Sequence, residues 1–143
     1  MVPSSKSLGG LVDELDEIRV DHFKCYPVIE TENTPEFVPL EVSVLDQFHN
    51  VPRTILVRWP NRLCNPVDKN GEGIINEDEH LLCYELGSVG GQSRFAAIKN
   101  EINTNNQFGP LELDVLGEKR KTFNPSKLCV PSEKDISAAA SVE

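Results

Sequence analysis

The chain has 143 residues, of which 38% are hydrophobic, and this suffices for one ordinary domain or two very small ones. Its formal net charge of -9 at pH 7 repels phosphate backbones and anionic lipid surfaces, so we expect no nucleic-acid partner. No run approaches the roughly 20 consecutive apolar residues of a membrane-spanning helix, so we also expect no membrane insertion.

Residues 1–20 are predicted to form an N-terminal arm or a short helix. Leu11, Leu15 and Ile18 recur at helical spacing, with acidic residues between them. The first ten residues lack a basic region followed by an apolar stretch, so a secretory signal is either absent or already removed.

The rest of the chain carries the patterns of β-strands. The stretch "DHFKCYPV" is rich in β-forming residues, and "RTILVRWP" alternates, with Ile55, Val57 and Trp59 on one face. Later in the chain "LELDVLG" alternates in the same way. Ten prolines and nine glycines divide these runs into short pieces, which is typical of an all-β protein.

Three short blocks occur twice in the same order, which indicates an internal duplication. "DHFKCY" is matched by "EHLLCY", "DQF" by "NQF", and "RLCNPVDKN" by "KLCVPSEKD". We predict two tandem, pseudo-repeated small β modules, each a barrel or a sandwich with one disulfide. The predicted parts are copy 1 over residues 21–67, an acidic inter-repeat loop over 68–79, copy 2 over 80–131 and a flexible tail over 132–143.

The four cysteines occupy equivalent places in the two copies, one near each end. The simplest pairing joins Cys25 to Cys64 and Cys83 to Cys129, which closes two loops of about 40 residues, each worth about 4 kcal/mol. The sequence allows two alternatives. One is the crossed pairing of Cys25 with Cys83 and Cys64 with Cys129, and the other is four free thiols. No C-x-x-C pair occurs, which argues against a zinc ribbon or a redox motif.

The acidic stretch "DKNGEGIINEDE" resembles the calcium loop of the EF-hand family. It has an oxygen-bearing residue or a free carbonyl at each ligand position and a glycine at the sharp turn, Gly73. Its flanks are not helical, so the resemblance covers these residues alone, and the alternative is an acidic hinge. The predicted calcium ligands are Asp68, Asn70, Glu72, the carbonyl of Ile74, Asn76 and Glu79.

No catalytic motif is recognisable in the sequence. The three histidines, His22, His49 and His80, have no nucleophile motif beside them, and the turn around His49 suggests a solvent-exposed side chain. We therefore expect the protein not to be an enzyme.

A single tryptophan is the other candidate for binding. Alternation with Ile55 and Val57 favours a core position for Trp59. The alternative is a sugar-stacking platform formed by Trp59, Tyr26 and Tyr84, which would bind a glycan.

The motifs "DHFKCY", "LCNPVDKNGEG", "NQFG" and "LCVPS" resemble a family of uncharacterised cysteine-containing domains from predicted secreted bacterial proteins. The resemblance spans roughly residues 21–134 and implies export, disulfide pairing and no known catalytic residues. We therefore expect an extracellular structural protein that self-assembles into a surface layer, fibre or matrix, with a carbohydrate-binding or adhesion module as the alternative.

Overall fold

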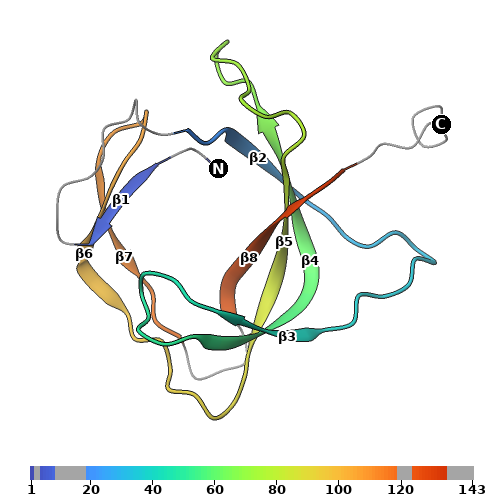
Figure 1. Cartoon of the computed structure of the whole chain (residues 1–143), viewed down its shortest axis with the longest axis vertical. Helices are drawn as coiled ribbons and strands as arrows, with labels where there is room; N and C mark the ends of the chain where they lie inside the picture. The colour runs from blue at the N-terminus through green and yellow to red at the C-terminus, as the bar shows by residue number, and fades with distance from the viewer. Residues whose placement is uncertain (2–3, 9–18, 119–123, 135–143) are drawn as a thin grey trace.

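The computed structural model describes residue 1 and residues 4–8, 19–118 and 124–134, which form eight strands and no helix (Figure 1). The predicted all-β fold is therefore confirmed. The predicted N-terminal helix falls on residues 9–18, and the predicted flexible tail falls mostly on residues 135–143, both outside the described residues. Within the described part there is no helix that could span a membrane.

The larger of two sheets contains the strands that carry all four cysteines. Its strands are antiparallel in the order β2-β4-β5-β8. β3 pairs with the first part of β4, and β2 pairs with the last part of the same strand. The strands are β2 (His22–Pro27), β3 (Leu40–Val44), β4 (Arg53–Val67), β5 (His80–Ser88) and β8 (Asn124–Ser132).

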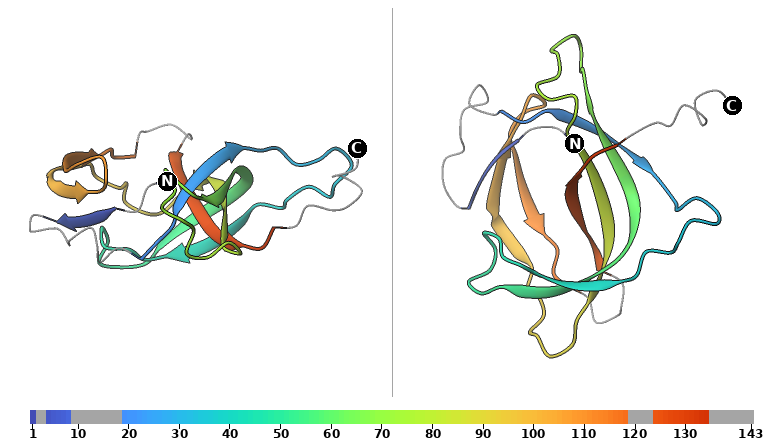
Figure 2. Two further views of the ribbon diagram at one scale, coloured as in Figure 1. Left: turned by 90° about the horizontal axis from the view of Figure 1, so that it is seen from above. Right: turned by 45° about the vertical axis from the view of Figure 1, so that its right-hand side comes forward.

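The smaller sheet has the order β1-β6-β7 and lies beside the larger one (Figure 2). It consists of β1 (Ser5–Leu8), β6 (Ile98–Asn105) and β7 (Leu111–Val115). Neither sheet closes on itself over the described residues, so the predicted barrel is not formed.

The long strand β4 is bent by two irregularities in its pairing with β5. The register shifts between Val57 and Trp59 and again between Pro60 and Arg62. Each shift adds a residue to β4 that has no partner on β5, which bends the strand and increases its twist. The first half of β4 pairs with β3 and the second half with β2, so the bends fall where the partner changes.

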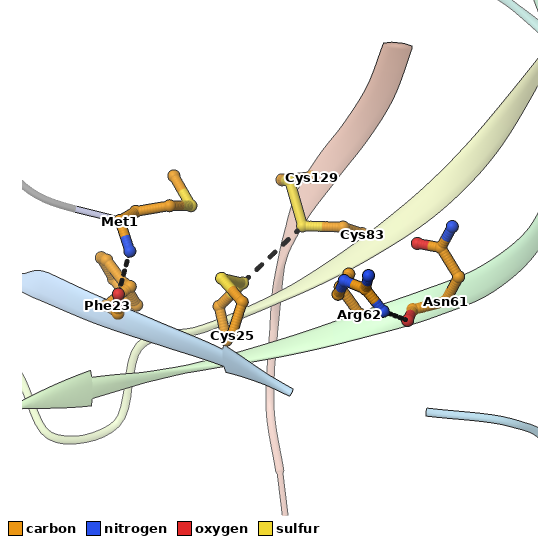
Figure 3. The surroundings of a disulfide bond; sticks show 8 residues. Met1, Phe23, Cys25, Asn61, Arg62, Cys83 and Cys129 are labelled. Atoms are coloured by element: carbon orange, nitrogen blue, oxygen red, sulfur yellow. Dashed lines mark hydrogen bonds between the residues drawn. A yellow bond between two sulfur atoms is a disulfide. The ribbon is translucent and has the colours of Figure 1, made fainter. Parts of the chain in front are cut away.

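Both predicted disulfides are formed, Cys25–Cys64 and Cys83–Cys129, and they join residues directly opposite each other on paired strands. The Sγ atoms of Cys64 and Cys83 lie 3.8 Å apart, so the two bridges are in contact (Figure 3). Cys64 is 0% exposed and Cys83 is 3% exposed, and they form the centre of the core together with Phe23.

The two halves of the chain show matching hydrogen-bond registers. Two residues before the first cysteine of each bridge, Phe23 lies opposite Pro66 and Leu81 opposite Pro131. The turns "DQF" and "NQF" also agree, since the carboxylate of Asp46 and the amide oxygen of Asn106 each accept the N–H two residues on. A duplication would produce these matches, and the duplication itself stays a prediction.

Strands from both halves pair in the larger sheet, while β6 and β7 of the second half belong to the smaller one. β4 and β5 pair directly beside the acidic loop, with Cys64 opposite Leu81. Residues 68–79 therefore connect the two strands of an antiparallel hairpin, and a hinge motion at this loop would have to break the pairing of β4 with β5.

Candidate functional site

The acidic loop is tightly turned around Asp68. Asn70, Gly71 and Gly73 have positive φ angles of 56°, 80° and 86°, a region that glycine and asparagine tolerate best. The Gly73 N–H donates to the Asp68 carboxylate over 3.1 Å. The two glycines thus allow the backbone to fold back onto the first predicted calcium ligand.

Glu72, another predicted ligand, contacts cationic and amide groups. Lys69 Nζ lies 2.9 Å from its carboxylate, His22 Nε2 lies 3.4 Å away, and Gln107 Nε2 donates over 2.7 Å. The Lys69 hydrogen bond lowers the pKa of Glu72, and Gln107 and the charges of Lys69 and His22 add to this against a raising effect of burial. This side chain ties the loop to the turn after β6.

The second half of the loop is anchored by Asp21. The Asp21 carboxylate, in a residue only 7% exposed, accepts the N–H of Ile75 over 2.6 Å and that of Asn76 over 2.8 Å. The Asn76 side chain in turn accepts the N–H of Asp78 over 3.0 Å. Asp21 was not identified from the sequence, because nothing in the "VDHF" pattern shows that the loop returns to this carboxylate.

The three predicted carboxylate ligands, Asp68, Glu72 and Glu79, lie in one loop but do not form a metal-binding group. Over the described residues, the structure contains no group of three or more His, Cys, Asp or Glu side chains placed to hold a metal ion. Asp68, Glu72 and Asn76 have the partners given above, and calcium binding at Asp68, Asn70, Glu72, Ile74, Asn76 and Glu79 stays a prediction.

Trp59 is 42% exposed, so the prediction of a core position is wrong. Val57 is 5% exposed, and strict alternation would put both side chains on one face, but the register shift between them reverses the alternation. The Arg58 guanidinium lies 4.3 Å from the Trp59 ring centroid, a cation–π contact on the surface.

Each ring of the predicted sugar platform has its own contacts with other residues. Tyr84 packs against Phe37 with ring centroids 5.2 Å apart, and Lys24 lies over Tyr26 at 4.9 Å. In the part of the chain that the structure describes, no ring contact joins Trp59 to either tyrosine. Trp59 is therefore left as a single exposed ring with an arginine beside it.

A cavity of about 600 Å³ lies where the end of β7 faces the larger sheet. Strands β3, β4, β5 and β8 contribute aliphatic side chains on one side, and residues 115–118 close the other. Representative lining residues are Val44, Ile55, Leu86, Val115, Leu116 and Leu128. Its size is within the range of sites that bind small molecules. Sequence patterns did not predict this cavity, because it depends on how the two sheets are placed.

The turn after β3 brings His49 to this cavity. His49 Nδ1 lies 2.9 Å from the Asp46 carboxylate, its ring packs against Phe95 at 5.1 Å, and its side chain is only 20% exposed. The expectation of a solvent-exposed His49 is therefore wrong. The reason is Phe95, which comes from the loop before β6 and covers the ring.

The charge on Asp46 follows from its surroundings. Burial alone would raise the pKa of Asp46, but hydrogen bonds from the Phe48 N–H and from His49, with the charges of His49 and Lys6, lower it below its ordinary value. An ionised carboxylate can only accept a hydrogen bond, so Nδ1 of His49 is the donor to Asp46. The Nε2 atom of the same ring is buried and has no hydrogen-bond partner.

Arg53, another charged residue at the cavity, is also paired. Its Nη2 atom lies 3.4 Å from Glu118, and its Nη1 atom donates to the Ser93 carbonyl over 2.8 Å. The lining thus combines an apolar surface with the ion pair of Arg53 and Glu118.

No family model, no curated protein and no solved structure matches the chain. The resemblance to secreted cysteine-containing domains therefore stays a prediction.

Proposed function

We propose that the protein is a non-enzymatic extracellular structural module that associates with copies of itself into an oligomer or polymer. Its two disulfides suit an oxidising compartment outside the cell. The observation that carries the proposal is the exposed apolar surface. Among the described residues, fifteen large hydrophobic side chains are exposed, and two of them, Ile29 and Val38, lie on one projecting segment that a partner could cover.

The most prominent part of this surface is the segment between β2 and β3, residues 28–39, which we name the β2–β3 arm. It projects away from both sheets (Figure 1). Ile29 is 92% exposed and Val38 is 76% exposed on its two limbs. A hydrogen bond of 3.0 Å from the Phe37 N–H to Glu30 joins the limbs. The arm is thus held in shape without a partner, which lowers the entropy cost of binding one.

Open strand edges offer a second means of association. Among the described strands, β3 pairs with β4 alone, and its outer edge continues from the β2–β3 arm. An unpaired edge is a template for a strand from another chain. A neighbouring copy that packs on the arm would lie beside this edge.

Replacing both Ile29 and Val38 by glutamate is expected to abolish association. Both side chains are mostly exposed, so the fold should be unaffected, while two charges on the arm would oppose burial in an interface. Light scattering after gel filtration, in calcium and in chelator, should give an assembly for the unchanged protein and a 15.9 kDa monomer for the variant.

The matched control is Leu116→Glu, since Leu116 is 77% exposed after β7 and belongs neither to the arm nor to the acidic loop. It should assemble like the unchanged protein. A monodisperse monomer of the unchanged protein at all concentrations would rule out the proposal. Loss of assembly in chelator alone would support the calcium ligands predicted in the loop.

The exposed Trp59 favours a second candidate function, carbohydrate binding. A single exposed indole beside Arg58 offers a stacking face and hydrogen-bond donors to a sugar ring. This candidate predicts that a glycan quenches or shifts Trp59 fluorescence in a saturable manner. Trp59 is the one tryptophan of the chain, so the signal is unambiguous. An unchanged spectrum across a glycan panel would remove the candidate.

A further inference from the structure

The strand order of the larger sheet ends in β2 on one side and β8 on the other. Among the described strands, β2 pairs with β4 alone and β8 pairs with β5 alone. An edge strand presents N–H and C=O groups that can pair with another chain. Neither strand carries an acidic residue, although the chain has 23, so the two edges can approach each other without repulsion between carboxylates.

The pairing of β4 with β5 inside the chain is a template for such a contact. The disulfide partners Cys25 and Cys64 lie opposite each other on β2 and β4, and Cys83 and Cys129 do so on β5 and β8. β2 and β5 therefore have equivalent places in the two pairs, and so do the last part of β4 and β8. On its other side β4 pairs with β5, with Cys64 opposite Leu81. The equivalent contact between two copies joins β8 of one to β2 of the next.

The outer edge of β2 has its hydrogen-bonding groups in place. The Val28 N–H donates to the Asn61 carbonyl over 3.1 Å in the register of β2 with β4. Antiparallel pairing alternates, so the backbone groups of Cys25 and Phe23 point away from β4. The Phe23 N–H indeed donates to the Met1 carbonyl over 2.6 Å, and its carbonyl accepts from the Met1 ammonium (Figure 3). A strand from another copy would replace this one residue by a longer ladder.

The outer edge of β8 is suited to the same pairing. Proline lacks an N–H, so within a sheet its nitrogen faces away from the paired strand. Pro131 lies opposite Leu81 and therefore turns its nitrogen away from β5. Alternation then directs the N–H and C=O groups of Cys129 and Lys127 outward as well.

The exposure of the cysteines agrees with a missing neighbour at both edges. The two inner cysteines, where β4 pairs with β5, are buried, whereas Cys25 and Cys129 are only partly buried. Tyr26 on β2 is 41% exposed and Val130 on β8 is 38% exposed. A second copy at either edge would reduce the exposure of these side chains.

We propose that copies of the chain associate head to tail, with β8 of one copy added antiparallel to the outer edge of β2 of the next and Cys129 opposite Phe23 of that copy. This inference rests on the proposed function, self-association, and names the surfaces that carry it. The β2–β3 arm begins directly after β2, so a copy bound at β2 lies beside the arm. Because the contact joins two different surfaces, each added copy leaves a free edge for the next, and the sheet extends into a polymer.

One variant tests the edge of β8. Lys127→Pro removes an outward N–H and places a proline ring against the incoming strand, so it should weaken association about tenfold or more. Lys127→Ala keeps the N–H and is the matched control, which should associate like the unchanged protein. In light scattering over a concentration series, the mass of the unchanged protein should grow with concentration. A dimer of fixed mass would overturn the inference.

Cross-linking tests the register without relying on the proline variant. Leu63 lies opposite Leu82 inside the chain, so Leu128 of one copy should lie opposite Lys24 of the next. A mixture of Lys24→Cys chains with Leu128→Cys chains should therefore give a disulfide-linked pair on a non-reducing gel. A mixture of Lys24→Cys with Lys127→Cys should give none, because a shift of one residue turns the second side chain to the other face.

The outcomes separate this interface from self-association in general. If Lys127→Pro associates like Lys127→Ala, or if neither mixture cross-links, the inference is overturned, while assembly that depends on the β2–β3 arm would keep the proposed function. A monomeric unchanged protein at all concentrations would contradict both. If Lys127→Pro does not fold, the two cross-linking mixtures decide.

Discussion

Replacing Cys25 and Cys64 together by alanine is expected to lower the free energy of unfolding by about 4 kcal/mol. The bridge closes a loop with a sequence separation of 39 residues, and the chain-entropy relation assigns about this value to a loop of that length. Cys64 also has no exposed surface, so its loss leaves a small void at the centre of the core. Urea unfolding followed by Trp59 fluorescence measures the change.

The variant with Cys83 and Cys129 replaced by alanine is the natural comparison, with a sequence separation of 46 residues and a similar expected loss. Because Cys64 and Cys83 are in contact, the losses in the fourfold variant should deviate from additivity. Independent, strictly additive losses would contradict the conclusion that the two bridges form one core.

The pairing of the cysteines could be predicted because it depends on relations that the sequence displays. Cys25 and Cys83 stand in matching blocks, and so do Cys64 and Cys129, so a pairing that treats the copies alike was the simplest. The contact between the two bridges could not be predicted. It requires β4 and β5 to pair beside the cysteines, and this pairing joins residues on opposite sides of the acidic loop.

The alternation of apolar residues gave a wrong prediction at the point where the pairing register of β4 and β5 shifts. Val57 and Trp59 are two residues apart in an alternating run, yet one is buried and the other is exposed, because an extra residue in β4 has no partner on β5. Pro60, which follows Trp59 directly, is a residue that sheets accept at edges and bulges, and it was a signal of an irregularity that the alternation alone left out. The burial of His49 had no such local signal, because it depends on Phe95, a residue 46 positions later in the chain.

The bonding of the acidic loop could not be predicted from its own residues. The loop connects β4 to β5, and its glycines adopt the positive φ angles of a sharp turn. Its main anchor is Asp21, at the start of the first half, through the N–H groups of Ile75 and Asn76. The loop is thus ordered by a carboxylate outside it, which gives it a fixed shape before any ion binds.

Replacing Asp21 by alanine should therefore destabilise the protein by about 3 kcal/mol. The substitution removes two hydrogen bonds to a charged acceptor and leaves two partly buried N–H groups without a partner. Asp21→Asn, which keeps one acceptor oxygen, should lose about half as much. Asp78→Ala is the control, since it removes the same charge from an exposed position in the loop and should change stability by less than about 0.5 kcal/mol.

Chemical denaturation gives the three free energies, and amide hydrogen exchange at Ile75 and Asn76 tests their cause. Exchange at both amides should accelerate in Asp21→Ala and stay slow in Asp78→Ala, because only the first variant removes their acceptor. If Asp21→Ala and Asp78→Ala were equally stable, the carboxylate of Asp21 would not be the anchor of the loop. The order of the loop would then have to come from Glu72 and its contacts with Lys69 and Gln107.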